Sequence, residues 1–492
     1  MPELSHKTLF RIVGVYSTIA LVSLLAYVVP QLNIAITILF AVVFAVITFR
    51  SLEWGALIVL AELCVGVYGY LLSIDVAGAV FSIRVIMFVI WMSIALVRIG
   101  FYERAKFLEF IQKNQRLLLL IPLFVLVYGF LRGLWMGNDM HTLIFDSNAW
   151  IVWLYALPFI YVVKNKLLLW HSILAAAVWW SVVSVMVMYI FGHQFEHIGW
   201  WAYHWLRDFR LVEITHIIGP FFRIFSQSMI FAIIPGFVLF IDLIQKRTWT
   251  KHTKYNFWLL IVISIGIVAS QSRSFILGIG VAVIFGVVMV YVKKAHMAFS
   301  AVKTVSVPIM AIFSSIAVLV IFALFPVPLV DLDSFSLLDR FSSDEPAAQS
   351  RIQQLEPLSR AVSESPILGA GFGKTVTYTS SDPRIVAQSP GESGLYTTYA
   401  FEWGYFDMIL KLGYIGFFTF IAFLYLIIQK GQKALQLVYT PYTLGLFLSC
   451  IALLVVHVTT PYLNHPIGIG YFICVIILGS WYDRSTQEEQ KI

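Results

Sequence analysis

The stretch GIVASQSRSFILGIG, residues 266–280, places one arginine, Arg273, in the middle of an apolar region. Within residues 255–292, between Lys254 and Lys293, Arg273 is the one charged residue. A single helix over this range would be about 57 Å long, nearly twice the roughly 30 Å hydrocarbon core of a bilayer. Two shorter helices fit a bilayer, and the polar SQSRS segment is then the predicted tip of a helical hairpin.

The whole chain has the composition of a polytopic membrane protein. Of its 492 residues, 60% are hydrophobic and 12% are charged, and the mean hydropathy is +0.87. We predict one all-α integral membrane domain over residues 1–492, whose first span lacks a cleavage site and is retained. About 14 transmembrane helices are predicted, at residues 9–30, 32–49, 54–73, 80–98, 117–132, 143–163, 167–192, 224–243, 256–271, 274–292, 304–328, 403–428, 442–460 and 464–481.

The positions of the basic residues predict the orientation. Short loops rich in lysine and arginine face the cytoplasm, and alternate loops of this chain follow that bias when the N-terminus is cytoplasmic. We therefore predict cytoplasmic N- and C-termini and two large outer loops, 193–223 and 329–401, the second before the last three spans. The net charge of +7 then reflects the lysine and arginine residues of the predicted cytoplasmic loops. We therefore expect no nucleic-acid partner. Cys64, Cys450 and Cys474 fall within spans, so no disulfide framework is predicted.

Most basic residues on the predicted outer side are arginines. The planar guanidinium of arginine suits bidentate binding of phosphate, and it keeps its charge when partly buried. The alternative explanation is that lysine is simply enriched on the inner side. Arg273 in particular either binds a phosphate group or reaches the lipid headgroups.

The first outer loop, 193–223, is rich in aromatic residues and histidines. Its aromatic residues favour a segment that lies in the membrane interface, and stacking on sugar rings is the second interpretation; they are Trp200, Trp201, Tyr203 and Trp205. Its histidines lack the HExxH pattern and a cysteine partner, so we predict no metal site; they are His193, His197, His204 and His216.

The second outer loop, 329–401, contains a predicted amphipathic helix and a glycine-rich segment. RIQQLEPLSRAVSESP, residues 351–366, is predicted to be either a lid on the membrane or a packed surface helix, with one apolar face formed by Ile352, Leu355, Leu358 and Val362. PILGAGFGKT follows, but Leu368 occupies the first glycine position of a phosphate-binding Walker A loop. We therefore interpret Gly369, Gly371 and Gly373 as allowing a tight backbone path against the helices.

The next predicted span opens with three charged residues. Asp407 and Lys411 are spaced i,i+4 and can pair on one helical face. Glu402 lies at the mouth of the span, where an acidic residue is either a functional group or a favourable partner of the helix dipole.

Three motifs in this order resemble the O-antigen ligase and polymerase superfamily. SQSRSFILG (270–278) is similar to the T-x-SRG-type signature at an outer helix end, ESPILGAGFG (364–373) to the P-x-x-G-x-G element, and LGYIGFF (412–418) to the LG-x-x-G that follows the His-Asn catalytic motif. FFRIFSQS (221–228) is similar to the family's arginine segment and contains Arg223. The resemblance covers about residues 210–430 and implies a GT-C-like membrane glycosyltransferase.

The resemblance implies an activity in surface polysaccharide biosynthesis. A polyprenyl-pyrophosphate-linked glycan donor would be transferred to a glycan, lipid or other hydroxyl acceptor, or polymerised, at the outer face of the bacterial cytoplasmic membrane. The resemblance implies a metal-independent transfer without a cofactor. No nucleotide sugar or ATP is expected, because the pyrophosphate leaving group supplies the driving force. Ligase and polymerase are both left open, since they share this donor chemistry.

The resemblance also assigns site residues. Counting back from Gly416, the family's histidine position is Glu402 and its asparagine position is Trp403. The reference pKa of glutamate is about 4.3, against about 6.5 for histidine, so a glutamate would need burial to act as the base near neutral pH. The expected pyrophosphate ligands are Arg273, Arg223 and Arg210, and the secondary candidates are Arg351, Arg360, Asp407 and Lys411.

A multi-span transporter or flippase for a lipid-linked glycan is the alternative function. Glu62 and Arg84 are charged residues in consecutive predicted spans, where they either belong to a transport path or pair with each other. Transporters commonly show internal repeats, and we find none in this sequence.

Overall fold

The computed structural model describes residues 6–76, 79–113, 117–163, 166–194, 203–218, 221–246, 248–292, 301–324, 346–387, 389, 391 and 393–479. Within these residues, ten helices are long and apolar enough to cross a membrane. Three apolar helices are shorter: Leu120–Trp135, Arg273–Met289 and Pro466–Gly479. The predicted all-α, multi-span membrane fold is therefore confirmed, whereas the number of 14 spans is not.

In the described residues from 6 to 194, the regular elements are helices apart from one hairpin. The helices are α1 (His6–Val28), α2 (Pro30–Arg50), α3 (Leu52–Val65), α4 (Ile83–Val97), α5 (Arg104–Lys113), α6 (Leu117–Trp135), α7 (Met140–Ile151), α8 (Ala156–Val163) and α9 (Leu167–Gln194). The π-helix η1 (Arg98–Tyr102) continues α4, and the 3-10 helix η2 (Val152–Tyr155) joins α7 to α8. Strands β1 (Ser73–Val76) and β2 (Ala79–Ser82) pair antiparallel.

The predicted span 54–73 is wrong in its second half. Helix α3 ends at Val65, and Gly69 has a φ of 87°, which no α-helix contains. A helix of 14 residues is only about 21 Å long, too short to cross a bilayer by itself.

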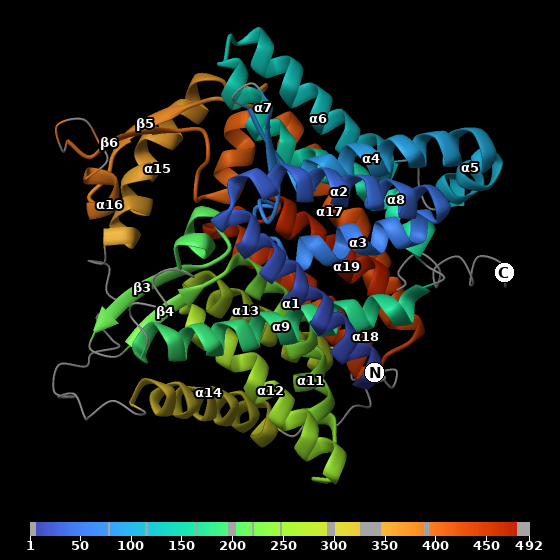
Figure 1. The fold of residues 1–492 in the computed structure, drawn as a ribbon, viewed down its shortest axis with the longest axis vertical. Helices are drawn as coiled ribbons and strands as arrows, with labels where there is room; N and C mark the ends of the chain where they lie inside the picture. The colour runs from blue at the N-terminus through green and yellow to red at the C-terminus, as the bar shows by residue number, and fades with distance from the viewer. Residues whose placement is uncertain are drawn as a thin grey trace.

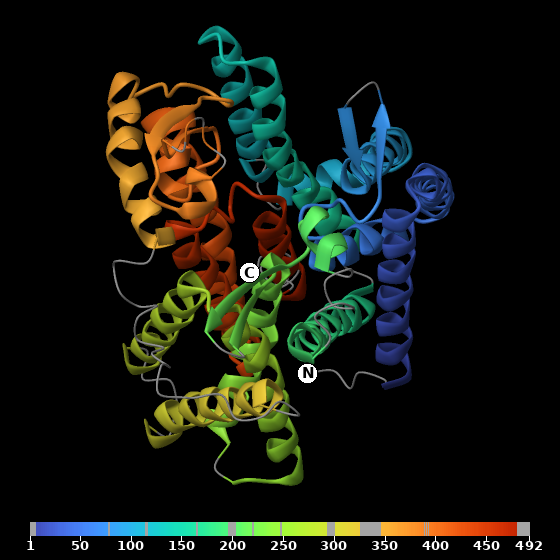
Figure 2. The same ribbon diagram turned by 60° about the vertical axis from the view of Figure 1, so that its left-hand side comes forward.

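The C-terminal half contains two further hairpins. Strands β3 (Glu213–Ile218) and β4 (Phe221–Phe225) pair antiparallel, and so do β5 (Val376–Thr379) and β6 (Leu395–Thr398). The helices are η4 (Gln227–Ala232), α11 (Ile233–Gln245), α12 (Lys251–Ser270), α13 (Arg273–Val292), α14 (Ala301–Leu324), α15 (Pro346–Glu364), α16 (Pro383–Val386), α17 (Gly404–Leu437), α18 (Pro441–Thr459) and α19 (Pro466–Gly479). In both views α13 and α14 lie below the region that carries α15, β5 and β6 (Figure 1, Figure 2).

The centre of the protein is formed by helices that are apolar on all sides. Helix α18 packs against α11, α13, α17 and α19, and α19 is buried from Ile467 to Gly479. A short apolar helix of this kind is typical of a protein core. Cys64, Cys450 and Cys474 are buried and free, as the sequence predicts.

The predicted division of the apolar range around Arg273 into two helices is confirmed, but these helices do not pack on each other as a hairpin: α12 packs mainly against α14, and α13 against α18. Helix α12 ends at Ser270, Gln271 adopts the left-handed conformation with a φ of 44°, and α13 begins at Arg273. A left-handed residue ends a helix, because the intrahelical hydrogen bonds cannot continue through it. Arg273 therefore lies in the first turn of α13.

Candidate active site

Helix α17 is broken at Gly413, and the glycine-rich segment 366–373 fills the break. Gly413 has a φ of 63° and a ψ of −178°, so the carbonyls before it and the amides after it lose their helical partners. The segment supplies new partners, and the hydrogen bonds are Ala370 N to Leu410 O (2.8 Å), Gly371 N to Lys411 O (2.9 Å), Tyr414 N to Pro366 O (2.8 Å) and Ile415 N to Ile367 O (3.3 Å). The glycine-rich segment is thereby fixed to the start of α17.

The three glycines of this segment allow the close approach that the sequence predicts. Gly369, Gly371 and Gly373 have φ values of 72°, 78° and 79°, a region that side chains disfavour. A Cβ at Gly371 would lie 2.0 Å from the backbone nitrogen of Gly133 in α6. This confirms that the glycines serve backbone packing.

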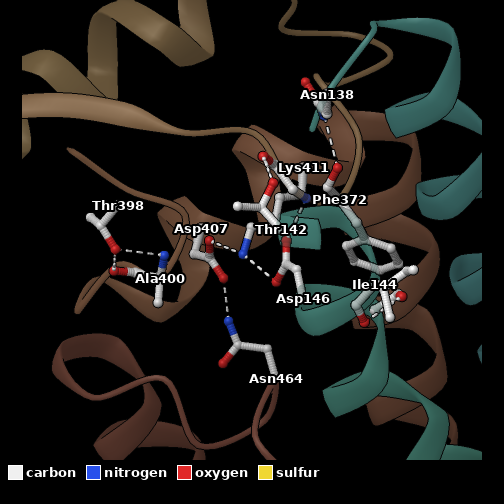
Figure 3. A network of polar contacts seen from close by, with 12 residues as sticks. Asn138, Thr142, Ile144, Asp146, Phe372, Thr398, Ala400, Asp407, Lys411 and Asn464 are labelled. Atoms are coloured by element: carbon white, nitrogen blue, oxygen red, sulfur yellow. Dashed lines mark hydrogen bonds and ion pairs between the residues drawn. The ribbon is translucent and has the colours of Figure 1, made fainter. Parts of the chain in front are cut away.

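A buried ionic cluster lies beneath the segment (Figure 3). Lys411 donates to Asp146 of α7 at 2.7 Å and forms an ion pair with Asp407 at 2.7 Å, which confirms the predicted i,i+4 pair. The side chain of Asn464 donates to Asp407, and the backbone amide of Gly373 donates to Asp146 at 2.8 Å. The cluster connects α7, the glycine-rich segment, α17 and the α18–α19 connection.

Asp146 and Asn464 were not among the residues predicted from the sequence. Asp146 lies in a predicted span, and a carboxylate inside a membrane span is a signal that it has a partner. The sequence separation of 265 residues between Asp146 and Lys411 hides that partner. Asn464 carries no comparable signal.

A cavity of about 1290 Å³ lies between the 346–403 region and helices α11 to α14. Its lower walls are apolar side chains of these four helices, for example Phe237, Ile263, Val283 and Leu319. Its polar end carries Gln354 and the charged lining residues Arg223, Arg273, Arg351, Glu213, Asp382 and Glu402. Common small-molecule pockets measure about 300–1,000 Å³, so this cavity is large enough for a lipid-sized ligand with a charged head.

Two of the expected pyrophosphate ligands meet at the polar end. Arg223 is half-buried on β4, its Nε donates to the carbonyl of Ser270 at 2.9 Å, and its guanidinium lies 4.9 Å from the ring of Phe225. Arg273 begins α13 only three residues after Ser270 and is half-buried. The arrangement provides guanidinium groups at the end of an apolar chamber, where phosphate oxygens are bound well.

Glu402 lies at the same end of the cavity, paired with Arg351 of α15. Its carboxylate accepts from the Arg351 guanidinium, and its backbone amide donates to Gln354 Oε1 at 3.0 Å. The Glu402 side chain is 50% exposed. The burial that a glutamate base was expected to need is therefore not found. Glu402 instead faces the cavity and is paired with Arg351.

The remaining expected ligands lie outside the cavity lining. Arg210 has its guanidinium 5.6 Å from the ring centre of Tyr68, and the hydroxyl of Tyr68 accepts from the Gln227 amide at 2.9 Å. Tyr68 and Gln227 line the cavity, and Arg210 is not among the lining residues in the described part of the chain. Arg360 forms an exposed i,i+4 pair with Glu356 on the outer surface of α15.

Helix α15 is a packed surface helix, one of the two predicted alternatives. Leu358, Ala361 and Val362 pack with Phe401 and other apolar residues, whereas Ile352 is 52% exposed. The buried face therefore differs from the predicted apolar face at its N-terminal end.

Next to α15, β5 brings a tyrosine to the polar end of the cavity. Burial raises the pKa of the Tyr378 phenol, against the opposing effect of its hydrogen bond with Ser350. Tyr378 therefore stays neutral near pH 7 and lines the cavity as a hydrogen-bonding group.

The first outer loop and the charged pair in the predicted spans also have definite places. Trp205 is buried and donates to Ser23 at 3.1 Å, so its side chain packs inside the protein. The described residues do not include Trp200, Trp201 and His197, nor the side chains of His193 and His216.

Glu62 and Arg84 form a buried bidentate pair with two contacts of 2.8 Å. Of the two predicted alternatives, a transport path or a pair, the structure therefore shows the pair.

The fold and the cavity define a multi-span membrane protein with a site of mixed charge, three arginines and three carboxylates, at the end of an apolar chamber. Residues 258–421 match the family model described as O-Antigen ligase, which confirms the predicted resemblance. The matched range includes Arg273, Arg351 and Glu402, and it ends after the break at Gly413. No curated protein matches the chain. The family match supports a glycosyltransferase-like enzyme of surface polysaccharide biosynthesis.

Proposed function

We propose that this protein transfers or polymerises a polyprenyl-pyrophosphate-linked glycan at the outer face of the bacterial cytoplasmic membrane. The observation that carries the proposal is the cavity, in which four apolar helices meet the guanidinium groups of Arg223 and Arg273 and the carboxylate of Glu402. A polyprenyl chain is apolar along its whole length, and a pyrophosphate is a compact anion. The two chemical halves of the cavity therefore match the two halves of the donor.

In this mechanism the acceptor hydroxyl oxygen attacks the anomeric carbon of the donor glycan. The bond between that carbon and the phosphate oxygen breaks, and polyprenyl pyrophosphate leaves with the electron pair. We assign removal of the hydroxyl proton to Glu402, whose half-exposed carboxylate lines the cavity and is shielded from water once donor and acceptor fill it. A positioned base commonly contributes about 10²–10⁴-fold. Arg273 and Arg223 stabilise the charge that develops on the leaving group, and this effect is strong where water is excluded.

The orientation follows from the same proposal. Arg273, Arg351 and Glu402 lie at one end of the cavity, so the α12–α13 tip and the 346–403 region share one side of the membrane. We assign this side to the outside and both termini to the cytoplasm, because the lysine-rich loops lie at the opposite ends of these helices.

A deletion strain tests the proposal through its surface glycans. Gel analysis is expected to show loss of long glycan chains on deletion, recovery with the wild-type gene, and no recovery with Glu402→Gln at equal expression. Glu356→Gln is the matched control, because Glu356 is an exposed glutamate of α15, and it is expected to restore the chains. Unchanged glycans in the deletion strain would overturn both transfer and polymerisation.

A further inference from the structure

We propose that Arg351 couples donor binding to release of the base, an inference that rests on the proposed function. In the unliganded protein the Arg351 guanidinium holds the Glu402 carboxylate. When the donor enters, Arg351 exchanges this partner for the pyrophosphate, and Glu402 becomes available to the acceptor hydroxyl.

The positions of the two residues allow this exchange without a change in the backbone. Arg351 and Glu402 both line the cavity that contains Arg223 and Arg273. Trp403 Nε1 donates to the Arg351 carbonyl at 2.9 Å, and the Glu402 amide donates to Gln354 at 3.0 Å. Two hydrogen bonds thus hold α15 against the start of α17, so that only the two charged side chains have to rotate.

The exposure of the pair makes the exchange favourable. The side chains of Arg351 and Glu402 are 35% and 50% exposed, and ion pairs at such positions are weak because water competes for both charges. A pyrophosphate carries more charge than a carboxylate and accepts bidentate bonds from the guanidinium. Arg351 therefore gains by moving from Glu402 to the donor.

The pair also explains why the exchange matters for the reaction. The Arg351 guanidinium occupies Oε2 of Glu402 with a charge-assisted hydrogen bond, so this oxygen is not available to an acceptor hydroxyl while the pair is formed. The side chain becomes a competent base only when the donor is in place. A histidine, which carries no permanent negative charge, would not form this pair, so the coupling belongs to the glutamate of this chain.

A double-mutant cycle on ligand binding tests the inference without using transfer activity. The ligand is undecaprenyl pyrophosphate without a glycan, and the full-length proteins are wild type, Glu402→Gln, Arg351→Ala and the double variant, matched for melting temperature. Glu402→Gln is expected to bind about two- to fivefold more tightly than wild type, because Arg351 is released from its partner. In the Arg351→Ala background the same substitution is expected to give a clearly smaller gain, and Arg351→Gln replaces Arg351→Ala if that variant unfolds.

Simple charge repulsion between Glu402 and the pyrophosphate predicts the opposite order of the two affinity gains in this cycle. Without Arg351 the Glu402 charge is unpaired and repels the ligand more strongly, so the gain from Glu402→Gln would be equal or larger in the Arg351→Ala background. That result would overturn the inference alone. Undecaprenol, with the same tail and no phosphate, is expected to bind all four proteins equally. No binding of undecaprenyl pyrophosphate to any of them would overturn the inference together with the proposed function.

Discussion

Replacing Lys411 by methionine removes the cation that lies between Asp146 and Asp407 and keeps the length of the side chain. Lys411 and Asp407 are each 2% exposed and Asp146 is 9% exposed, and both contacts to Lys411 measure 2.7 Å. The substitution therefore leaves two buried carboxylates without a cation. Removing one partner of a buried ion pair destabilises a protein by about 3–5 kcal/mol, because the remaining charge is uncompensated.

The assay is thermal unfolding of the purified full-length protein in detergent, compared among variants. Lys411→Met is expected to lower the melting temperature strongly, and adding Asp146→Asn and Asp407→Asn is expected to recover much of the loss, because no buried charge then remains. The control is Lys374→Met: Lys374 pairs with Glu364 at 3.6 Å on the surface, where such a pair contributes about 0–1 kcal/mol. Equal melting temperatures for Lys411→Met and Lys374→Met would refute the buried cluster.

Three further predictions concern the site and its sidedness. Arg273→Lys is expected to impair transfer nearly as much as Arg273→Ala, because lysine keeps the charge but loses the bidentate fork; normal transfer by the lysine variant would favour contact with lipid headgroups instead. Gly371→Ala is expected to destabilise the protein by about 2–5 kcal/mol in thermal unfolding, because Gly371 has a positive φ and the added Cβ would lie 2.0 Å from the backbone nitrogen of Gly133. A change below about 0.5 kcal/mol would contradict the packing of the glycine-rich segment against α6. A membrane-impermeant thiol reagent is expected to label Ser359→Cys in intact cells and Lys433→Cys only after lysis; the reverse pattern would invert the topology.

The helix break before Arg273 and the glycine-rich segment were predictable because their signals are local. An isolated charge in an apolar range of fixed length leaves few ways to cross a bilayer, and Gly369 and Gly371 follow a proline that ends a helix. The pairing of Asp407 with Lys411 was predictable for the same reason, since four residues separate them.

The partners that come from distant parts of the chain were not predictable. Asp146 reaches Lys411 across 265 residues, and Arg351 reaches Glu402 across 51 residues. Helical periodicity describes one element at a time, so it does not show which elements meet. It also missed the end of α3 at Val65, because the apolar residues continue past the point where the backbone turns.

The central claim is that the protein breaks the bond between a lipid pyrophosphate and its glycan. The most direct measurement uses purified protein in liposomes that contain an undecaprenyl-pyrophosphate-linked glycan, with an acceptor glycan and without nucleotides or ATP. Wild-type protein is expected to release undecaprenyl pyrophosphate and form an equal amount of new glycosidic bond. Glu402→Gln is expected to be about 10²–10⁴-fold slower, with partial activity in Glu402→His. Movement of the intact donor across the bilayer, with its glycan still attached, would contradict the account and identify a flippase.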